Sequence, residues 1–276
     1  MSETPNSPVN KSPKETSLEK AILRRLPPGR LRRLAELVLA DEEVHALQEY
    51  ANVVSIKRLG YNDHGPVHMR KVLLNALTLA DLLHQAGIPL SLENEEIGTH
   101  EDSLAAILLA GMLHDVGMSV TRSNHEEFSM LLARQPLERF LLAHYPDDLR
   151  RRVVVSSLIT ECVTGHMGTI HIHSMEAGII LIADGCDMEK GRARIPMMIA
   201  TEAKVGDIHK YSSAAIERIE LTPGDHRPIR ITVHMSSSVG FFQVEEVLFP
   251  KLSRSPIKPH VELHAGVIGE EMKVYL

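Results

Sequence analysis

The stretch L-L-A-G-M-L-H-D-V-G, from Leu108 to Gly117, decides the fold of this chain. Every residue from Leu104 to Leu113 is apolar or glycine, so a helix here is hydrophobic on all sides and belongs in the middle of the protein. The helix leads into His114 and Asp115, and Gly117 is placed to cap its end. A carboxylate at the end of a buried helix is costly unless it is paired, hydrogen-bonded or bound to a metal. This pair is therefore the first candidate for chemistry.

A second segment repeats this pattern. Residues Ala177–Ala183 are all apolar or glycine, with Ser174 as the expected N-cap, and the run ends in Asp184 with Asp187 one turn later. An isolated His-Asp dipeptide is more often a solvent-exposed helix end than a site. Two buried helices that both end in an acid form a pattern that packing alone does not explain, and this favours a functional site.

Histidines supply further candidates. His64 and His68 are four residues apart and share one face of a helix that we expect after the N-cap Asp63. His125 falls in the first turn of a helix that starts near Asn124, and His166 lies between glycines in T-G-H-M-G. Taken alone, each has an ordinary structural explanation, as a cap, a core residue or a solvent-exposed side chain. Four others have polar neighbours and are predicted to be surface residues: His45, His84, His144 and His226.

The composition limits the functional classes. The net charge of -6 gives no indication of a nucleic-acid or anionic-membrane partner, since such partners usually require a basic face, although local basic pockets remain open. The two cysteines lie far apart and outside any paired motif, which excludes a disulfide framework and a thiolate zinc site. The N-terminus has no apolar signal core, and the longest apolar runs, of about ten residues, are too short to span a bilayer. We therefore expect a cytoplasmic protein with no nucleic-acid or membrane partner.

The predicted fold is mainly α, with a small C-terminal α+β appendage. Residues 1–17 read as a disordered tail, residues 18–205 as a helical domain and residues 206–276 as a small α+β region. The polar stretch 91–102 is expected to be a surface loop, and one long helix is expected from residue 30 towards residue 59. The α+β region has β-like runs at 215–221, 229–235 and 259–265, with an amphipathic helix at 239–252.

Together, His68, His114-Asp115 and Asp184 resemble the H…HD…D signature of the HD-domain superfamily of metal-dependent phosphohydrolases. The similarity covers roughly residues 61–196. The run A-G-M-L-H-D-V-G resembles the second motif of that family, and L-I-A-D-G-C-D-M resembles its last. The chain departs from the HD-GYP branch, because no second histidine adjoins His166 and no Gly-Tyr-Pro follows. It also has Met118 where many relatives carry lysine.

The resemblance implies an HD-type helical bundle with a divalent metal centre of two ions. One ion would be held by His68, His114, Asp115 and Asp184; the second would be held by Asp115, His125 and His166. These ligand types suit Mn, Fe, Co, Ni or Zn, and carboxylate with water would accommodate Mg. Asp115 would then be catalytic as the bridging ligand. His64 would protonate the leaving group, a position that resembles the proton-donating histidine of the cyclic-nucleotide phosphodiesterase branch.

Three cations after the last motif, Lys190, Arg192 and Arg194, would bind the phosphate of a small, nucleotide-type phosphomonoester or phosphodiester, or else form a solvated helix end. Asp187 would orient its neighbours rather than bind metal. Because HD proteins often self-associate, a homo-oligomer is also expected. Two alternatives remain open: a di-iron HD-type oxygenase, and a regulatory HD module that binds a nucleotide without turning it over.

Overall fold

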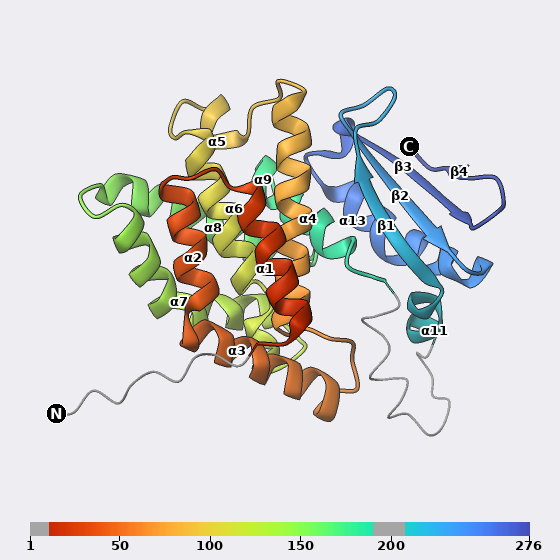
Figure 1. The fold of residues 1–276 in the computed structure, drawn as a ribbon, viewed down its shortest axis with the longest axis horizontal. Helices are drawn as coiled ribbons and strands as arrows, with labels where there is room; N and C mark the ends of the chain where they lie inside the picture. The colour runs from red at the N-terminus through yellow and green to blue at the C-terminus, as the bar shows by residue number, and fades with distance from the viewer. Residues whose placement is uncertain (1–10, 190–207) are drawn as a thin grey trace.

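The computed structural model describes residues 11–189 and 208–276 as a helical body that carries a small sheet at one end (Figure 1). The body contains α1 (Pro13–Arg25), α2 (Arg30–Ala40), α3 (Glu42–Val53), α4 (Pro66–Gln85), α5 (Ser91–Asn94), α6 (His100–Leu113), α7 (His125–His144), α8 (Leu149–Gly165) and α9 (Met175–Gly185). Short helical turns cover Val54–Arg58 after α3 and Val116–Ser119 after α6. The predicted mainly-α class is thus confirmed.

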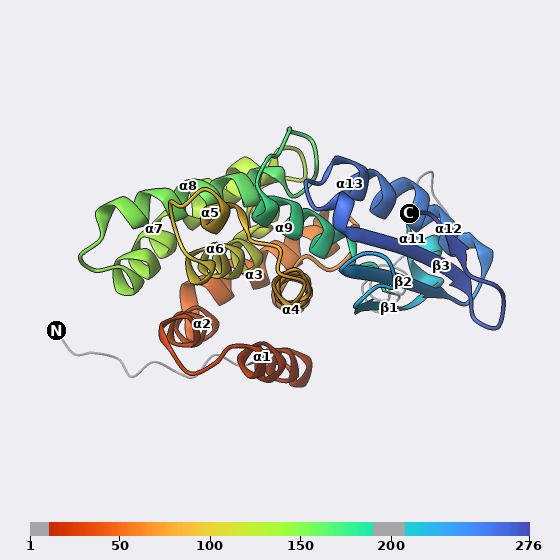
Figure 2. The same ribbon diagram turned by 90° about the horizontal axis from the view of Figure 1, so that it is seen from above.

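Helix α6 lies at the centre of the body, as its sequence predicts. All residues from Ala105 to Leu113 are buried, and the helix packs against α4, α8 and α9. Figure 2 shows α6 enclosed by its neighbours. Thr99 and Asp102 form a capping box at its start, which satisfies backbone donors that the first turn would otherwise leave unpaired.

The C-terminal region has the predicted α+β character. It contains α11 (Ile208–Ala214), β1 (Ile216–Thr222), β2 (Ile229–Met235), β3 (Val261–Val267) and β4 (Lys273–Val274). The sheet order is β1-β2-β3-β4, and the central β2–β3 pair is parallel whereas the two outer pairs are antiparallel. A parallel pair requires a crossover connection between its strands, and residues 238–260 provide it. This crossover consists of a turn at Ser238–Gly240, α12 (Phe241–Gln243), a π-helical turn at Val244–Leu248, α13 (Phe249–Arg254) and a turn at Lys258–His260.

Helix boundaries differ from the prediction where capping decides them. Residues 13–17, predicted to belong to the disordered tail, form the start of α1, because Ser12 and Glu15 build a capping box. The single helix predicted after residue 30 is broken at Asp41, whose carboxylate caps α3 by accepting from Val44. In the predicted loop 91–102, α5 forms one helical turn and α6 already begins at His100.

The surface assignment was wrong for two histidines. His45 is buried against Glu15, with 2.9 Å between His45 Nε2 and the carboxylate, and His144 is buried at the end of α7. In both cases a tertiary contact covers a side chain whose sequence neighbours are polar. The polarity of neighbouring residues in the sequence therefore did not predict whether these two side chains are exposed.

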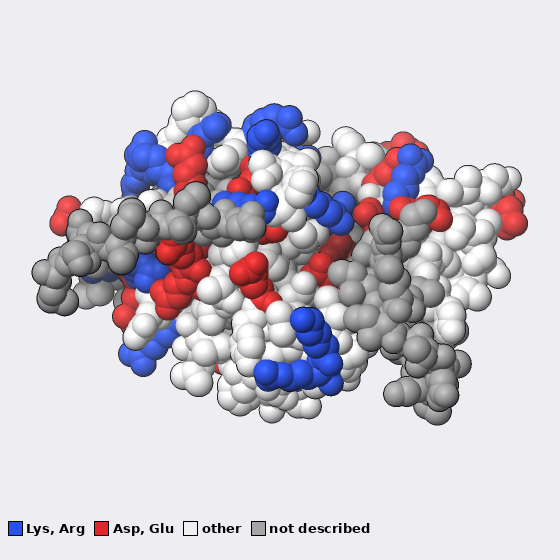
Figure 3. Space-filling model, turned by 60° about the horizontal axis from the view of Figure 1, so that its bottom comes forward, with Lys and Arg blue, Asp and Glu red and all other residues white. Residues whose placement is uncertain are grey.

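The described surface carries charges of both signs. On the face drawn in Figure 3, basic and acidic side chains are interspersed among uncharged ones. Within residues 11–189 and 208–276, no helix combines the length and the apolar composition that crossing a membrane would require.

Candidate metal centre

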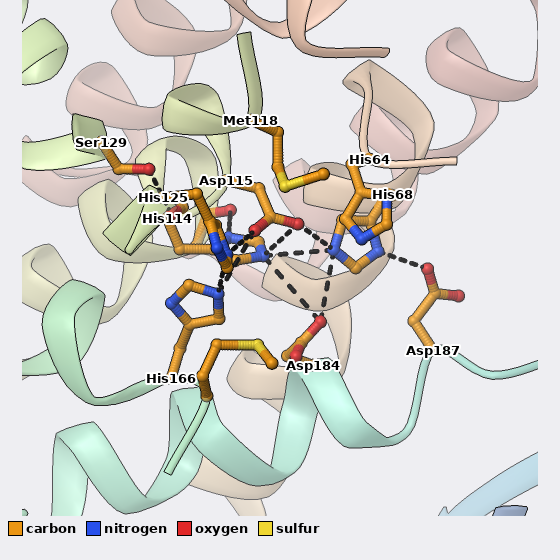
Figure 4. A network of polar contacts seen from close by, with 12 residues as sticks. His64, His68, His114, Asp115, Met118, His125, Ser129, His166, Asp184 and Asp187 are labelled. Carbon is orange, nitrogen blue, oxygen red and sulfur yellow. Dashed lines mark hydrogen bonds and ion pairs between the residues drawn. The ribbon is translucent and has the colours of Figure 1, made fainter. Parts of the chain in front are cut away.

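The structure brings the six predicted ligand residues together in the interior of the body. They form two groups that share Asp115, and within each group the ligand atoms lie within 4.8 Å of one another. The first group is His68, His114, Asp115 and Asp184; the second is Asp115, His125 and His166. All are buried (Figure 4). These groups could hold metal ions.

The ligands come from the ends of five helices. His68 lies in the first turn of α4, which starts after Gly65 with Pro66 in its first turn rather than after the predicted cap Asp63. His114 ends α6, and Asp184 lies at the end of α9. His125 begins α7, and His166 ends α8.

Gly117 allows these helix ends to meet. It lies in the turn after Asp115 rather than capping α6, where His114 takes the cap position. A Cβ atom at Gly117 would lie 2.0 Å from the backbone oxygen of His125, so only glycine permits this approach. The turn therefore rests directly on the start of α7, and Asp115 comes within reach of His125.

The two oxygens of Asp115 face different groups. Oδ2 lies 3.0 Å from His68 Nε2 and 3.5 Å from His114 Nε2. Oδ1 lies 3.0 Å from His125 Nε2 and 3.2 Å from His166 Nε2. Asp184 completes the first group, with its Oδ1 3.3 Å from His68 Nε2. This arrangement suits a carboxylate that bridges two ions.

The outer nitrogen of each ligand histidine contacts an oxygen. His114 Nδ1 is 3.1 Å from the carbonyl of Gly111, His125 Nδ1 is 2.9 Å from that of Arg122, and His166 Nδ1 is 2.7 Å from that of Val163. His68 Nδ1 instead lies 2.7 Å from Asp187 Oδ2. Because a carbonyl or carboxylate oxygen accepts, each Nδ1 carries the proton. Each Nε2 therefore directs a lone pair into the cluster, as metal binding requires.

Two nitrogen–nitrogen contacts inside the cluster have no proton with which to form a hydrogen bond. His68 Nε2 is 3.2 Å from His114 Nε2, and His125 Nε2 is 3.1 Å from His166 Nε2. With the protons on Nδ1, both members of each pair are acceptors, which repel one another unless a cation lies between them. Asp115 Oδ1 is likewise buried and forms no hydrogen bond of ordinary geometry with any described residue. The donor set thus fits a bound cation.

The charge states of His114 and Asp115 also suit metal binding. Burial is the main cause that lowers the pKa of His114 to about 3, so this imidazole is neutral at neutral pH. Burial alone would raise the pKa of Asp115, but the surrounding imidazoles, first His114, outweigh it and hold the pKa well below its usual range. Neutral imidazoles and an anionic carboxylate are the forms that coordinate metals.

His64 lies beside the cluster. Its Nδ1 is 2.6 Å from the carbonyl of Asn62 and 2.8 Å from Ser55 Oγ, and its ring centroid is 5.6 Å from that of His68. His64 thus lies next to the ligands, and Asp187 lies behind the ring of His68. Lys190, Arg192 and Arg194 lie outside the described residues.

Lys251, on α13, was not predicted to lie at this centre. Its ammonium donates to Asp184 Oδ2 and to the carbonyl of His166, at 2.9 Å for the latter, and the side chain is buried. Arg254, one turn later, donates to the carbonyl of Gly168 at 2.6 Å. No local sequence signal indicated these contacts, because they join segments more than sixty residues apart. The C-terminal region thus contributes a cation to the centre.

Comparison with known proteins gives one informative match. No protein-family model matches the chain, and no solved structure matches it. The chain is similar to "Uncharacterized protein MJ1020" of Methanocaldococcus jannaschii, with 37% identity over 234 residues, which cover 85% of this chain and 88% of the relative. Identity at this level over nearly the whole of both chains indicates common descent. The chain therefore belongs to the same protein family as MJ1020.

Proposed function

We propose that the protein is a metal-dependent phosphohydrolase of the HD-domain superfamily, which cleaves a phosphomonoester or phosphodiester, most simply one of nucleotide type. The observation that carries this proposal is the bridging geometry of Asp115, whose Oδ2 faces His68 and His114 while its Oδ1 faces His125 and His166. Two divalent ions held there would supply a water of lowered pKa and charge stabilisation for in-line attack on phosphorus.

Residues around the proposed ions would orient the ligands, donate a proton and exclude water. Asp187 fixes the ring of His68 through Nδ1, and Lys251 holds the carboxylate of Asp184 through Oδ2. His64 is held through its Nδ1 by the carbonyl of Asn62 and by Ser55. In its imidazolium form it would give the proton on Nε2 to the departing oxygen. Burial of the cluster excludes bulk water and strengthens each of these electrostatic contacts.

The test is hydrolysis of a broad panel of phosphomonoesters and phosphodiesters, nucleotides included, by purified protein with added Mn. We expect turnover that disappears in Asp115→Ala, together with a loss of bound metal. His64→Ala should keep its metal and lose most turnover, by about 10²–10⁴-fold if it removes a general acid. Loss of metal from this second variant would make His64 a ligand instead.

Two results would contradict the proposal. Full activity in Asp115→Ala would remove the metal centre from the reaction. No turnover on any ester, in protein shown to contain two irons and to consume oxygen, would indicate the di-iron oxygenase. A regulatory module without catalysis is disfavoured, because all six ligands are present and assembled.

A further inference from the structure

Arg122 lies at the rim of the candidate metal centre. Its Nη1 is 3.8 Å from the sulfur of Met118 and its Nη2 is 3.9 Å from that of Met167. Met118 follows Asp115 by one turn, with its backbone N–H donating to the carbonyl of Asp115, and Met167 directly follows His166. Figure 4 shows the Met118 side chain beside the cluster. The guanidinium thus contacts two thioether side chains whose residues stand next to, or one turn after, ligand residues in the chain.

An aromatic ring and two sulfur atoms hold the guanidinium in place. Its Cζ lies 5.6 Å from the centroid of the Tyr61 ring, a cation–π arrangement, and its other contacts are sulfur atoms, which are weak acceptors. Within residues 11–189 and 208–276, Arg122 forms no ion pair with a carboxylate. Lys251, the other long cation at the centre, is instead bonded to Asp184. An incoming anion would therefore reach the donors of Arg122 without displacing any carboxylate of the described segments.

The backbone of Arg122 already belongs to the centre. Its carbonyl oxygen accepts from His125 Nδ1, so the same residue orients a ligand through its main chain and directs a cation to the rim through its side chain. The next residue but one, Asn124, adopts a left-handed conformation with φ of 56°, which asparagine tolerates better than most residues. The loop before α7 is thereby turned so that Arg122 and His125 both face the centre.

We propose that Arg122 binds the phosphate group of the substrate, with its planar guanidinium contacting phosphate oxygens while the reacting phosphorus lies over the metal ions. A guanidinium suits this task because its fixed N–H donors match a phosphate in bidentate geometry. Tyr61, Met118 and Met167 position this side chain through their ring and sulfur contacts. The inference rests on the proposed phosphohydrolase function and names a phosphate-binding residue for it in the described part of the chain.

The test separates binding from turnover. Calorimetry of the Mn-loaded protein with inorganic phosphate would compare the wild type with Arg122→Met, Arg122→Lys and the control Arg134→Met, whose side chain is 76% exposed on α7. Arg122→Met should keep its metal, because its main-chain carbonyl still holds His125, and should bind phosphate at least tenfold more weakly. Arg122→Lys should be intermediate, and the control unchanged.

Kinetics on the substrate found by the ester panel gives the second readout. Arg122→Met should raise KM about tenfold or more, and an effect on metal content or on the control would indicate a structural role instead. Phosphate affinity within twofold of the wild type in Arg122→Met would overturn the proposal, even if Asp115→Ala abolishes hydrolysis. Arg122-dependent phosphate binding without any ester hydrolysis would preserve the anion site and reject the phosphohydrolase function.

Discussion

Lys251→Met tests whether the C-terminal region stabilises the metal centre. The change removes a buried ammonium from Asp184, whose side chain is 9% exposed, and removes the donor to the carbonyl of His166. Breaking a buried ion pair by deleting one partner costs about 3–5 kcal/mol, because the other charge is left uncompensated. Methionine retains most of the packing of the lysine stem. For a chain of about this size, the loss corresponds to a fall of roughly 10 °C in melting temperature.

The effect should depend on metal. A divalent ion held by Asp184 would supply the positive charge that the variant lacks, so the penalty would fall. We therefore expect thermal unfolding of the metal-free protein to show the full destabilisation and Mn to raise the melting temperature of Lys251→Met by more than it raises that of the wild type. Ligand-linked stabilisation of this kind is measured directly by titrating the metal during thermal unfolding.

A matched control lies in the same region. Lys273 is 55% exposed and pairs with Glu245 on the surface, so Lys273→Met should leave the melting temperature almost unchanged. Equal melting temperatures for the two metal-free variants would show that the Lys251–Asp184 contact contributes nothing. A destabilisation of Lys251→Met that Mn does not reduce would refute the link to the metal.

Two further predictions concern the buried side chains of Asp187 and His144. Asp187→Ala should weaken metal binding about 10–100-fold, because His68 loses the carboxylate that holds its Nδ1–H, and competition with a chelator measures this; an unchanged affinity would contradict it. Burial, and then the Arg30 guanidinium, lower the pKa of His144 to about 4, so the unfolded chain binds more protons as the pH falls below 6.5. His144 therefore does not reduce the free energy of unfolding above pH 6.5, but it lowers that free energy by about 2 kcal/mol at pH 5. Urea unfolding should show this loss in the wild type and not in His144→Gln. The same pH dependence in both proteins would reject the assignment.

Prediction from the sequence was most accurate where one segment contains both a helix and the candidate ligand that follows it. Apolar runs followed by an acid, ten residues long at 104–113 and seven at 177–183, identified α6 and α9 and also pointed to Asp115 and Asp184. The strands were found within about two residues of their bounds, because alternation of apolar and polar residues is also local. The two-residue strand β4 was missed because it is too short to show any alternation.

Features that depend on distant segments were not predicted. The contacts of Lys251 with α9 and of Arg122 with Met167 join residues that are far apart in sequence, and nothing in their local surroundings marks them. The burial of His144 has the same origin. The start of α1 was missed for a different reason: Ser12 and Glu15 have the spacing of a capping box, but the polar composition around them was given more weight.

The anchors of three ligand histidines follow a common rule. Gly111, Arg122 and Val163 each precede the histidine they hold by three residues, and each acts through its carbonyl oxygen. Every residue type has this carbonyl, so the identity of the anchoring residue places little constraint on ring orientation. Only His68 relies on a side chain, that of Asp187, for this purpose. The sequence around the centre can therefore diverge widely in evolution while the ligand geometry persists, and the His68–Asp187 pair is where mutation could adjust the properties of the metal.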